Sequence, residues 1–310
     1  MGFDEKFDFQ KLTPAGIIMV VFWAIAVVLW QTTGDIFYLF NFVYLGTAIG
    51  VGIGLYMALP RRQRHWGRRI SQFFMGGYLL VFLGLLKWEN MQLEGFFFYL
   101  VSGFFGGSLV HYLVAKIGGP LLFNRGWCGW SCWTAMVLDF LPYKRNKRGR
   151  LDRKWGYLRY VHFALSLGVV ALWFGLGYRV ERHSVTQLYW LLGGNLFYFA
   201  SSITLAYLLK DNRAFCKYVC PIPTLLKIPS RFALLKIAGD ADKCDECGAC
   251  VQVCPMDIRI PDYTKNGQRV LSTECILCLE CVNVCSKGAL GTTFALDVAN
   301  QELLREGAAE

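Results

Sequence analysis

Eight of the twelve cysteines in this 310-residue chain lie in two runs near its C-terminal end, each with the spacing C-x2-C-x2-C-x3-C. In such a run the first three thiolates can wrap one face of an iron–sulfur cubane, while the fourth reaches a partner cluster. The spacing therefore predicts two 4Fe-4S clusters. The expected ligands are Cys244, Cys247, Cys250 and Cys285 for the first cluster, and Cys275, Cys278, Cys281 and Cys254 for the second.

Zinc and disulfide bonds are the two other uses of such cysteines. Zinc sites rarely combine two four-cysteine runs, and disulfide bonds require an oxidising compartment. We therefore expect residues 239–295 to form a two-cluster ferredoxin domain that carries single electrons, followed by a tail at 296–310.

The remaining four cysteines form two C-x3-C pairs, Cys128 with Cys132 and Cys216 with Cys220. The pairs are 88 residues apart, and the similarity extends to their surroundings, which read NRGWCGW and NRAFCKY. Further matches are Leu138 with Leu226 and, within one residue of register, Pro142 with Pro229. This pattern predicts a parallel internal repeat whose two loops bring the four thiols to one site.

Several kinds of site could use these four cysteines. Thiolates in a reducing compartment favour an iron–sulfur cluster or zinc, and the neighbouring ferredoxin runs favour a third cluster. Zinc or another metal, a redox-active thiol or disulfide pair, and small cysteines buried for packing alone stay open as alternatives.

The rest of the chain is too apolar for an ordinary soluble domain, with 55% hydrophobic and only 17% charged residues. Stretches long enough to cross about 30 Å of hydrocarbon recur in it. We expect an α-helical membrane domain at 14–238, after an N-terminal segment at 1–13. Its six transmembrane helices would span residues 14–31, 36–59, 70–87, 95–117, 157–178 and 187–209. The second and fourth are rich in glycine, which predicts close packing inside the bundle.

Lysine and arginine residues are concentrated in the loops on one side of this expected bundle. Segments 1–13, 60–69 and 118–156 hold fifteen of them, whereas the opposite loops hold three. Because such positively charged loops stay in the cytoplasm, we expect both termini and the ferredoxin domain there. The location would be the cytoplasmic (inner) membrane of a bacterium or archaeon.

The net charge of +10 is unevenly distributed, with −6 on residues 240–310 and +16 on residues 1–239. Basic loops at a membrane surface meet anionic lipid head groups, and here they also face an acidic domain of the same chain. We therefore expect no nucleic-acid partner. The chain also lacks a P-loop, a dinucleotide-binding glycine motif and a hydrolase elbow, so nucleotide cofactors are not expected.

Ionisable residues inside a membrane are costly and mark candidate functional groups. His111 and His162 would lie at similar depth on the cytoplasmic side of two neighbouring helices. They could ligate a haem b, bind a quinone, or hydrogen-bond between helices, and these alternatives stay open. At the opposite face, groups available for proton release are Glu89, Glu94, Arg179, Glu181, Arg182 and His183, most of them expected in a solvated loop.

The helical bundle, the two C-x3-C motifs and the two-cluster ferredoxin together resemble the NapH-like membrane-bound polyferredoxins, the quinol dehydrogenase components of periplasmic nitrate reduction. The membrane half of the nitrous-oxide reductase regulator and the FixG-type proteins share this arrangement. The resemblance covers most of residues 70–290, and Cys216, Cys220 and Pro221 match the family's C-x3-C-P motif. The chain departs from the family where Trp133 follows Cys132 and Ser286 follows Cys285 in place of proline.

The resemblance implies a membrane subunit that moves electrons between a quinone pool and cytoplasmic-side 4Fe-4S clusters. Its partners would be membrane lipid, quinone and the redox subunits of an oxidoreductase complex. Two alternatives stay open. One is a cofactor-assembly or docking subunit, and the other is a metal or thiol reductase that uses the C-x3-C cysteines.

Overall fold

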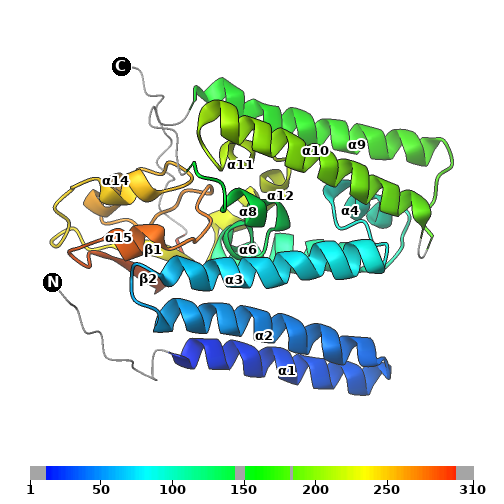
Figure 1. Cartoon of the computed structure of the whole chain (residues 1–310), viewed down its shortest axis with the longest axis horizontal. Helices are drawn as coiled ribbons and strands as arrows, with labels where there is room; N and C mark the ends of the chain where they lie inside the picture. Colours follow the sequence, from blue (N-terminus) through cyan, green and yellow to red (C-terminus); the bar gives the residue numbers. More distant parts are fainter. Residues whose placement is uncertain (1–11, 144–150, 182–183, 298–310) are drawn as a thin grey trace.

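The computed structural model describes residues 12–143, 151–181 and 184–297. A bundle of long helices makes up most of the molecule, and a small domain with two short strands lies at one end of it (Figure 1). We call the end of the bundle that carries this domain the near end, and the opposite end the far end.

Five helical segments are long and apolar enough to cross a membrane. They are α1 (Thr13–Thr33), α2 (Ile36–Ala58), α3 (Arg64–Gly77) with its π-helical continuation η2 (Tyr78–Leu86), α9 (Leu158–Gly175) after the 3-10 turn η4 (Arg153–Tyr157), and α10 (Val185–Leu209). Large apolar side chains point outward from them, among them Val20, Leu165 and Leu196. A helix satisfies its own backbone hydrogen bonds in hydrocarbon, so these segments make the chain a multi-pass membrane protein.

The second helix packs closely between the first and the third. A Cβ atom at Gly50 would overlap the Met19 side chain of α1, and one at Gly52 would overlap Ser71 of α3. Small residues at such contacts let helix backbones approach. The expected packing of the glycine-rich second span inside the bundle is therefore what the structure shows.

The prediction that the fourth span, residues 95–117, is one continuous helix is wrong. The helix α4 (Leu93–Val101) ends before a turn at Gly103, whose φ of +65° favours glycine. The chain resumes as α5 (Gly107–His111), the π-helix η3 (Tyr112–Gly118) and α6 (Gly119–Phe123). Apolar composition persists through the break, which is why hydropathy alone did not reveal it.

The helix α4 runs from the middle of the bundle back toward the far end. At its start, the Ser166 hydroxyl, halfway along α9, donates to Glu94 Oε1 at 2.6 Å. At its other end, the Phe98 ring lies 5.5 Å from the Tyr178 ring, beyond the end of α9. Segment 87–101 therefore enters the bundle from the far end and returns to it. Non-helical backbone at membrane depth is tolerated where protein surrounds it, and Asn90 in this segment is fully buried.

Short helices follow each half of the internal repeat. They are α7 (Gly126–Trp130) and α8 (Trp133–Leu138) in the first half, and α11 (Ala214–Tyr218) and α12 (Ile222–Arg231) in the second. In both halves the first cysteine lies in a five-residue helix and the second lies just before the next helix. The aligned residues Leu138 and Leu226 are both fully buried, so the sequence repeat is also a structural one.

The small domain is built around an antiparallel strand pair, in which β1 (Leu235–Gly239) pairs with β2 (Leu290–Phe294). Its helices are α13 (Ala249–Val253), α14 (Ile260–Lys265) and α15 (Glu280–Val284). The helices α13 and α15 pack on each other, and each contains the third cysteine of one run. This arrangement places the two cysteine runs side by side.

Candidate metal centres

The two cysteine runs have the same backbone shape. The third and fifth residues of each run adopt positive φ angles, at Glu246 and Gly248 in the first run and at Leu277 and Leu279 in the second. Left-handed residues in alternation turn backbone N–H groups toward the inside of a loop, which suits anionic groups. Backbone N–H groups beyond each run also donate to its last thiol: the Ile258 N–H lies 3.4 Å from Cys254 Sγ, and the Ala289 N–H lies 3.3 Å from Cys285 Sγ.

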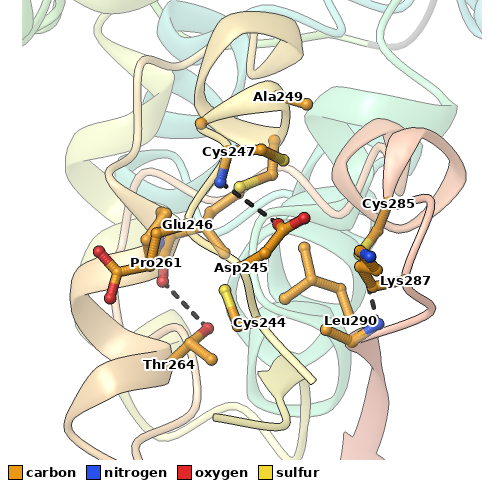
Figure 2. Close-up of a pocket in the computed structure, with 14 residues that line it drawn as sticks. Cys244, Asp245, Glu246, Cys247, Ala249, Pro261, Thr264, Cys285, Lys287 and Leu290 are labelled. Atoms are coloured by element: carbon orange, nitrogen blue, oxygen red, sulfur yellow. Dashed lines mark hydrogen bonds between the residues drawn. The ribbon is translucent and has the colours of Figure 1, made fainter. Parts of the chain in front are cut away.

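Each of two cavities in the small domain is lined by four cysteines. The distal cavity is lined by Cys244, Cys247, Cys250 and Cys285. Figure 2 shows Cys244 and Cys247 on one side of it and Cys285 on the other. The proximal cavity is lined by Cys254, Cys275, Cys278 and Cys281. Each cavity thus combines the first three cysteines of one run with the last cysteine of the other.

The donor set in both cavities fits an iron–sulfur cluster. Cysteine thiolates hold such clusters, and hydrogen bonds to sulfur tune them. Burial raises the pKa of Cys275 to about 12, so this thiol stays protonated unless a metal displaces its proton. Among the described residues, no group of three His, Cys, Asp or Glu side chains is arranged to hold a single metal ion.

The four cysteines of the two C-x3-C loops come together at the near end of the bundle. Burial raises the pKa of Cys220 well above its usual value, and the other three thiols of the group, Cys216, Cys132 and Cys128, raise it further. Burial and the neighbouring thiols likewise raise the pKa of Cys216 to about 11, against the opposing effect of Arg213. The convergence of the two loops on one metal site stays a prediction, and the mutual electrostatic effects of these thiols support it.

Two arginines occupy equivalent places beside this group of thiols, and neither was singled out from the sequence. Arg125 hydrogen-bonds Cys128, and Arg213 hydrogen-bonds Cys216. Each arginine belongs to the repeated Asn-Arg pair, which was the available signal. Both are 1% exposed, so they are buried cations that offset negative charge on the thiolates. Lys116 adds a third buried cation near Cys128.

The small domain docks onto this thiol group through Glu274, the residue before Cys275. Its carboxylate lies 2.6 Å from Arg125 Nη1, 2.8 Å from Arg159 Nη1 and 2.9 Å from Lys227 Nζ. The Arg125 N–H also donates to the Cys275 carbonyl at 3.2 Å. A basic bundle surface therefore holds the acidic domain at the cysteine run itself.

This docking orders the three groups of cysteines in space. Cys128 of the C-x3-C site packs against the core of the small domain, which contains Cys275 and Cys278 of the proximal cavity. Cys247 of the distal cavity is exposed, whereas the cysteines of the proximal cavity are buried. In space, the three groups therefore follow one another from the C-x3-C site of the membrane domain, to the proximal cavity, and then to the distal cavity at the surface.

Further buried ion pairs lie on either side of the C-x3-C site. Asp139 lies 2.6 Å from Arg68 Nη1 and 2.7 Å from Arg213 Nη2. Lys217 lies 2.6 Å from both Asp211 and Asp257, the latter from the small domain. Burial opposes ionisation of Asp139, but the two arginines outweigh it and hold the pKa of Asp139 below its usual value.

The two histidines contact different C-x3-C loops. His162 Nδ1 lies 2.9 Å from the carbonyl oxygen of Val219, between the cysteines of the second loop. The His111 ring lies 4.8 Å from the Trp127 ring, next to Cys128 of the first loop. The quinone and haem interpretations stay predictions, and the contact with Val219 gives His162 an ordinary hydrogen bond in addition.

The residues expected at the far face lie in different surroundings. Glu89 accepts a hydrogen bond from the Ser108 N–H at 3.1 Å, and Glu181 is exposed. Arg179 donates to the Phe174 carbonyl at the end of α9, while Arg182 and His183 lie outside the described residues. The expectation of Glu94 at the far face is wrong, because the return of segment 87–101 puts its carboxylate against Ser166 inside the bundle.

Comparisons with protein families match both kinds of cysteine motif. A 4Fe-4S dicluster domain matches residues 236–286. A 4Fe-4S binding domain matches twice, at residues 105–156 and 192–237, with one C-x3-C pair in each match. No solved structure matches the chain.

Several curated proteins are similar to the chain. An uncharacterized protein of Methanocaldococcus jannaschii is 33% identical over 54% of this chain and 63% of its own length. The methylamine utilization ferredoxin-type protein MauN of Paracoccus denitrificans is 29% identical over 55% of this chain and 61% of its own length. The ferredoxin-type protein NapH of Haemophilus influenzae is 28% identical over 59% of this chain and 65% of its own length. The chain thus spans less than two thirds of the length of these three relatives.

The fold and the cysteine groups define a class: a multi-pass membrane protein with an iron–sulfur-binding ferredoxin domain that transfers electrons. Within that class, the chain is similar to the ferredoxin-type membrane proteins of the NapH-like kind. The resemblance that the cysteine motifs predicted is thereby confirmed.

Proposed function

We propose that this chain is the membrane subunit of a quinone-linked oxidoreductase and passes single electrons between a quinone pool and three iron–sulfur clusters. The observation that carries the proposal is the order of the three cysteine groups. The C-x3-C site lies at the near end of the bundle, the proximal cavity adjoins it through Cys128, and the distal cavity reaches the surface at Cys247. A partner protein can exchange electrons at that surface.

A quinone carries two electrons, whereas each cluster takes one. The C-x3-C cluster would therefore split a two-electron reaction into single steps, and the protein would supply spacing, insulation and tuning of potential. His111 and His162 are candidate contacts for the quinone because each touches one C-x3-C loop. Ligation of a haem b is the alternative role of these residues, and optical spectra of the purified protein would reveal it.

The orientation in the membrane is also a proposal. Fifteen lysine and arginine residues in segments 1–13, 60–69 and 118–156, against three in the opposite loops of the sequence, favour a cytoplasmic near end. A C-terminal alkaline phosphatase fusion should then be inactive, and a fusion after Gly34, at the far end of α1, should be active. The reverse pattern would show that the ferredoxin domain lies outside the cytoplasm.

The cofactor content of the purified full-length protein tests the main proposal. Three 4Fe-4S clusters require about twelve irons and as many sulfides. Reduction of these clusters by a quinol should give rise to their electron paramagnetic resonance signals. A content of about eight irons would show that there is no third cluster, and bound zinc would show that the C-x3-C cysteines hold a different metal. A quinol that reduces none of the clusters would contradict the quinone link. Loss of a partner enzyme's cofactor after deletion of this chain would favour the assembly alternative.

The reductase alternative has less support from the site. The thiolate is the reactive form of cysteine, and burial raises the pKa of both Cys216 and Cys220. Metal-free thiols at this place would be protonated and poor nucleophiles. Metal-dependent turnover by a protein with only two clusters would nevertheless establish that alternative.

A further inference from the structure

Segment 87–101 carries polar groups into the bundle, where the sequence predicted an apolar helix. Asn90 and Gln92 have only 0% and 3% of their surface exposed. Gln92 lies against Gly194 of α10, and Glu94 reaches Ser166 halfway along α9. An ionisable residue inside a membrane domain is costly and marks a functional group. The electron path described above gives Glu94 no role.

Several buried polar atoms of segment 87–101 and of the helices beside it have no hydrogen-bond partner within the part of the chain that the structure describes. They are Asn90 Nδ2, Gln92 Nε2, Glu94 Oε2, Ser108 Oγ and Tyr198 Oη. Leaving a buried polar atom without a hydrogen bond is costly, so a group of five such atoms requires another polar partner. Buried polar groups of this kind are ordinarily bridged by ordered water, which also conducts protons.

Glu94 lies between the C-x3-C site and the far end of the bundle. Three elements pack against α4, namely α5, α9 and α10. Tyr198 of α10 interacts electrostatically with Glu94 and with Cys220, and so does Tyr112 of η3, which directly follows α5 and its His111. The helix α9 presents the hydroxyl of Ser166 to Glu94.

A second carboxylate lies on the far-end side of this polar group. Glu89 accepts the Ser108 N–H at 3.1 Å, and the Ser108 hydroxyl is one of the buried unpartnered atoms. Glu89 follows the exposed residue Trp88 at the end of η2. Polar groups therefore lie at the tyrosines beside the thiols, at Glu94, and at a half-buried carboxylate near the far face.

We propose that Glu94 accepts the protons that a quinol releases when it gives electrons to the C-x3-C site, and passes them toward Glu89. This inference rests on the proposed quinone-linked function. In each of two steps an O–H bond of the quinol breaks, its proton goes to the Glu94 carboxylate, and one electron goes to the cluster. The quinol becomes a quinone after losing two electrons and two protons. Between the two steps Glu94 releases the first proton, and the first electron moves on to the ferredoxin domain, so that both acceptors are free again.

The experiment uses the full-length protein loaded with its clusters, with duroquinol as the probe. The rate of cluster reduction is followed by absorbance between pH 6 and pH 9 in the wild type, in Glu94→Gln and in Ser166→Ala. Dithionite, which needs no proton acceptor, reduces the same clusters as a check on folding and loading. The control is Asp262→Asn, which removes a carboxylate at the exposed surface of the small domain.

The expected result for Glu94→Gln is reduction by duroquinol about 100-fold slower than in the wild type, because a positioned proton acceptor contributes 10²–10⁴-fold. The rate should also lose its pH dependence, while reduction by dithionite stays unchanged. Ser166→Ala should keep a pH-dependent rate with a shifted midpoint, and Asp262→Asn should match the wild type.

Two different outcomes would overturn the inference. A Glu94→Gln protein that duroquinol reduces at the wild-type rate with the wild-type pH dependence shows that Glu94 takes no proton, and leaves the quinone link standing. A wild-type protein that dithionite reduces and no quinol reduces overturns the proposed function, and the inference with it.

Discussion

Arg125 Nη1 lies 2.6 Å from Glu274 Oε2, and this ion pair joins the two parts of the chain that carry cysteines. Arg125 stands three residues before Cys128 and hydrogen-bonds that thiol, while Glu274 directly precedes Cys275. One buried contact therefore fixes the spacing between the C-x3-C site and the proximal cavity. The proposed electron transfer between them would depend on that spacing.

Loss of the Glu274 charge should weaken the docking of the ferredoxin domain. In Glu274→Gln, Arg125 and Arg159 lose the carboxylate that they share while both stay buried. Removing one partner of a buried pair costs about 3–5 kcal/mol. We expect a lower thermal midpoint and faster release of the ferredoxin domain by protease, measured in detergent.

The matched control for Glu274 is Asp262→Asn in the same domain. Asp262 pairs with Arg259 at 2.9 Å, but both side chains are exposed. Exposed pairs contribute only about 0–1 kcal/mol, so this variant should behave as the wild type. Equal effects of the two substitutions would mean that Glu274 does not anchor the domain.

Asp139 should make the near end sensitive to acid. Its pKa in the folded protein is lowered, because Arg213 and Arg68 outweigh the opposing effect of burial. A lowered folded-state pKa stabilises the protein above the unfolded value of about 4, and this contribution is lost as the pH falls through the folded-state value. Thermal midpoints between pH 7 and pH 3 should therefore fall more steeply in the wild type than in Asp139→Asn. Parallel curves would contradict this assignment.

Cys128 and Cys216 should belong to one metal centre. If both are ligands of a single cluster, Cys128→Ala and Cys216→Ala should each remove the same electron paramagnetic resonance signal. The double substitution should add little, because residues that act as one unit are not additive. Two different signals that are lost independently would mean that the loops serve separate sites.

Gly95 should be required for the return of segment 87–101 into the bundle. A Cβ atom at Gly95 would overlap the Asn90 carbonyl oxygen, a backbone atom that has little freedom to move. Gly95→Ala should cost about 1–3 kcal/mol, as overpacking does, measured from the thermal midpoint. Gly168→Ala in α9 is the control, because nothing lies within 4 Å of its added Cβ. A helix interior favours alanine over glycine, so the control should be neutral or slightly stabilising.

The sequence by itself determined which cysteines meet. In a C-x2-C-x2-C run the short spacing leaves few backbone paths, so Cys244, Cys247 and Cys250 had to face one cavity. The repeated Asn-Arg and C-x3-C patterns likewise predicted the convergence of two loops. Five of the six expected spans follow from the same principle, since a long apolar helix satisfies its backbone locally.

Only the tertiary structure decided where Glu94 and Arg125 lie. The apolar stretch around Glu94 read as one helix, but contacts with Ser166 and Gly194, more than 70 residues away, fold it back into the bundle. Arg125 read as one of many basic loop residues, and its partner Glu274 is 149 positions later. Burial and charge pairing between distant segments are properties of the packed chain, which local spacing and hydropathy do not contain.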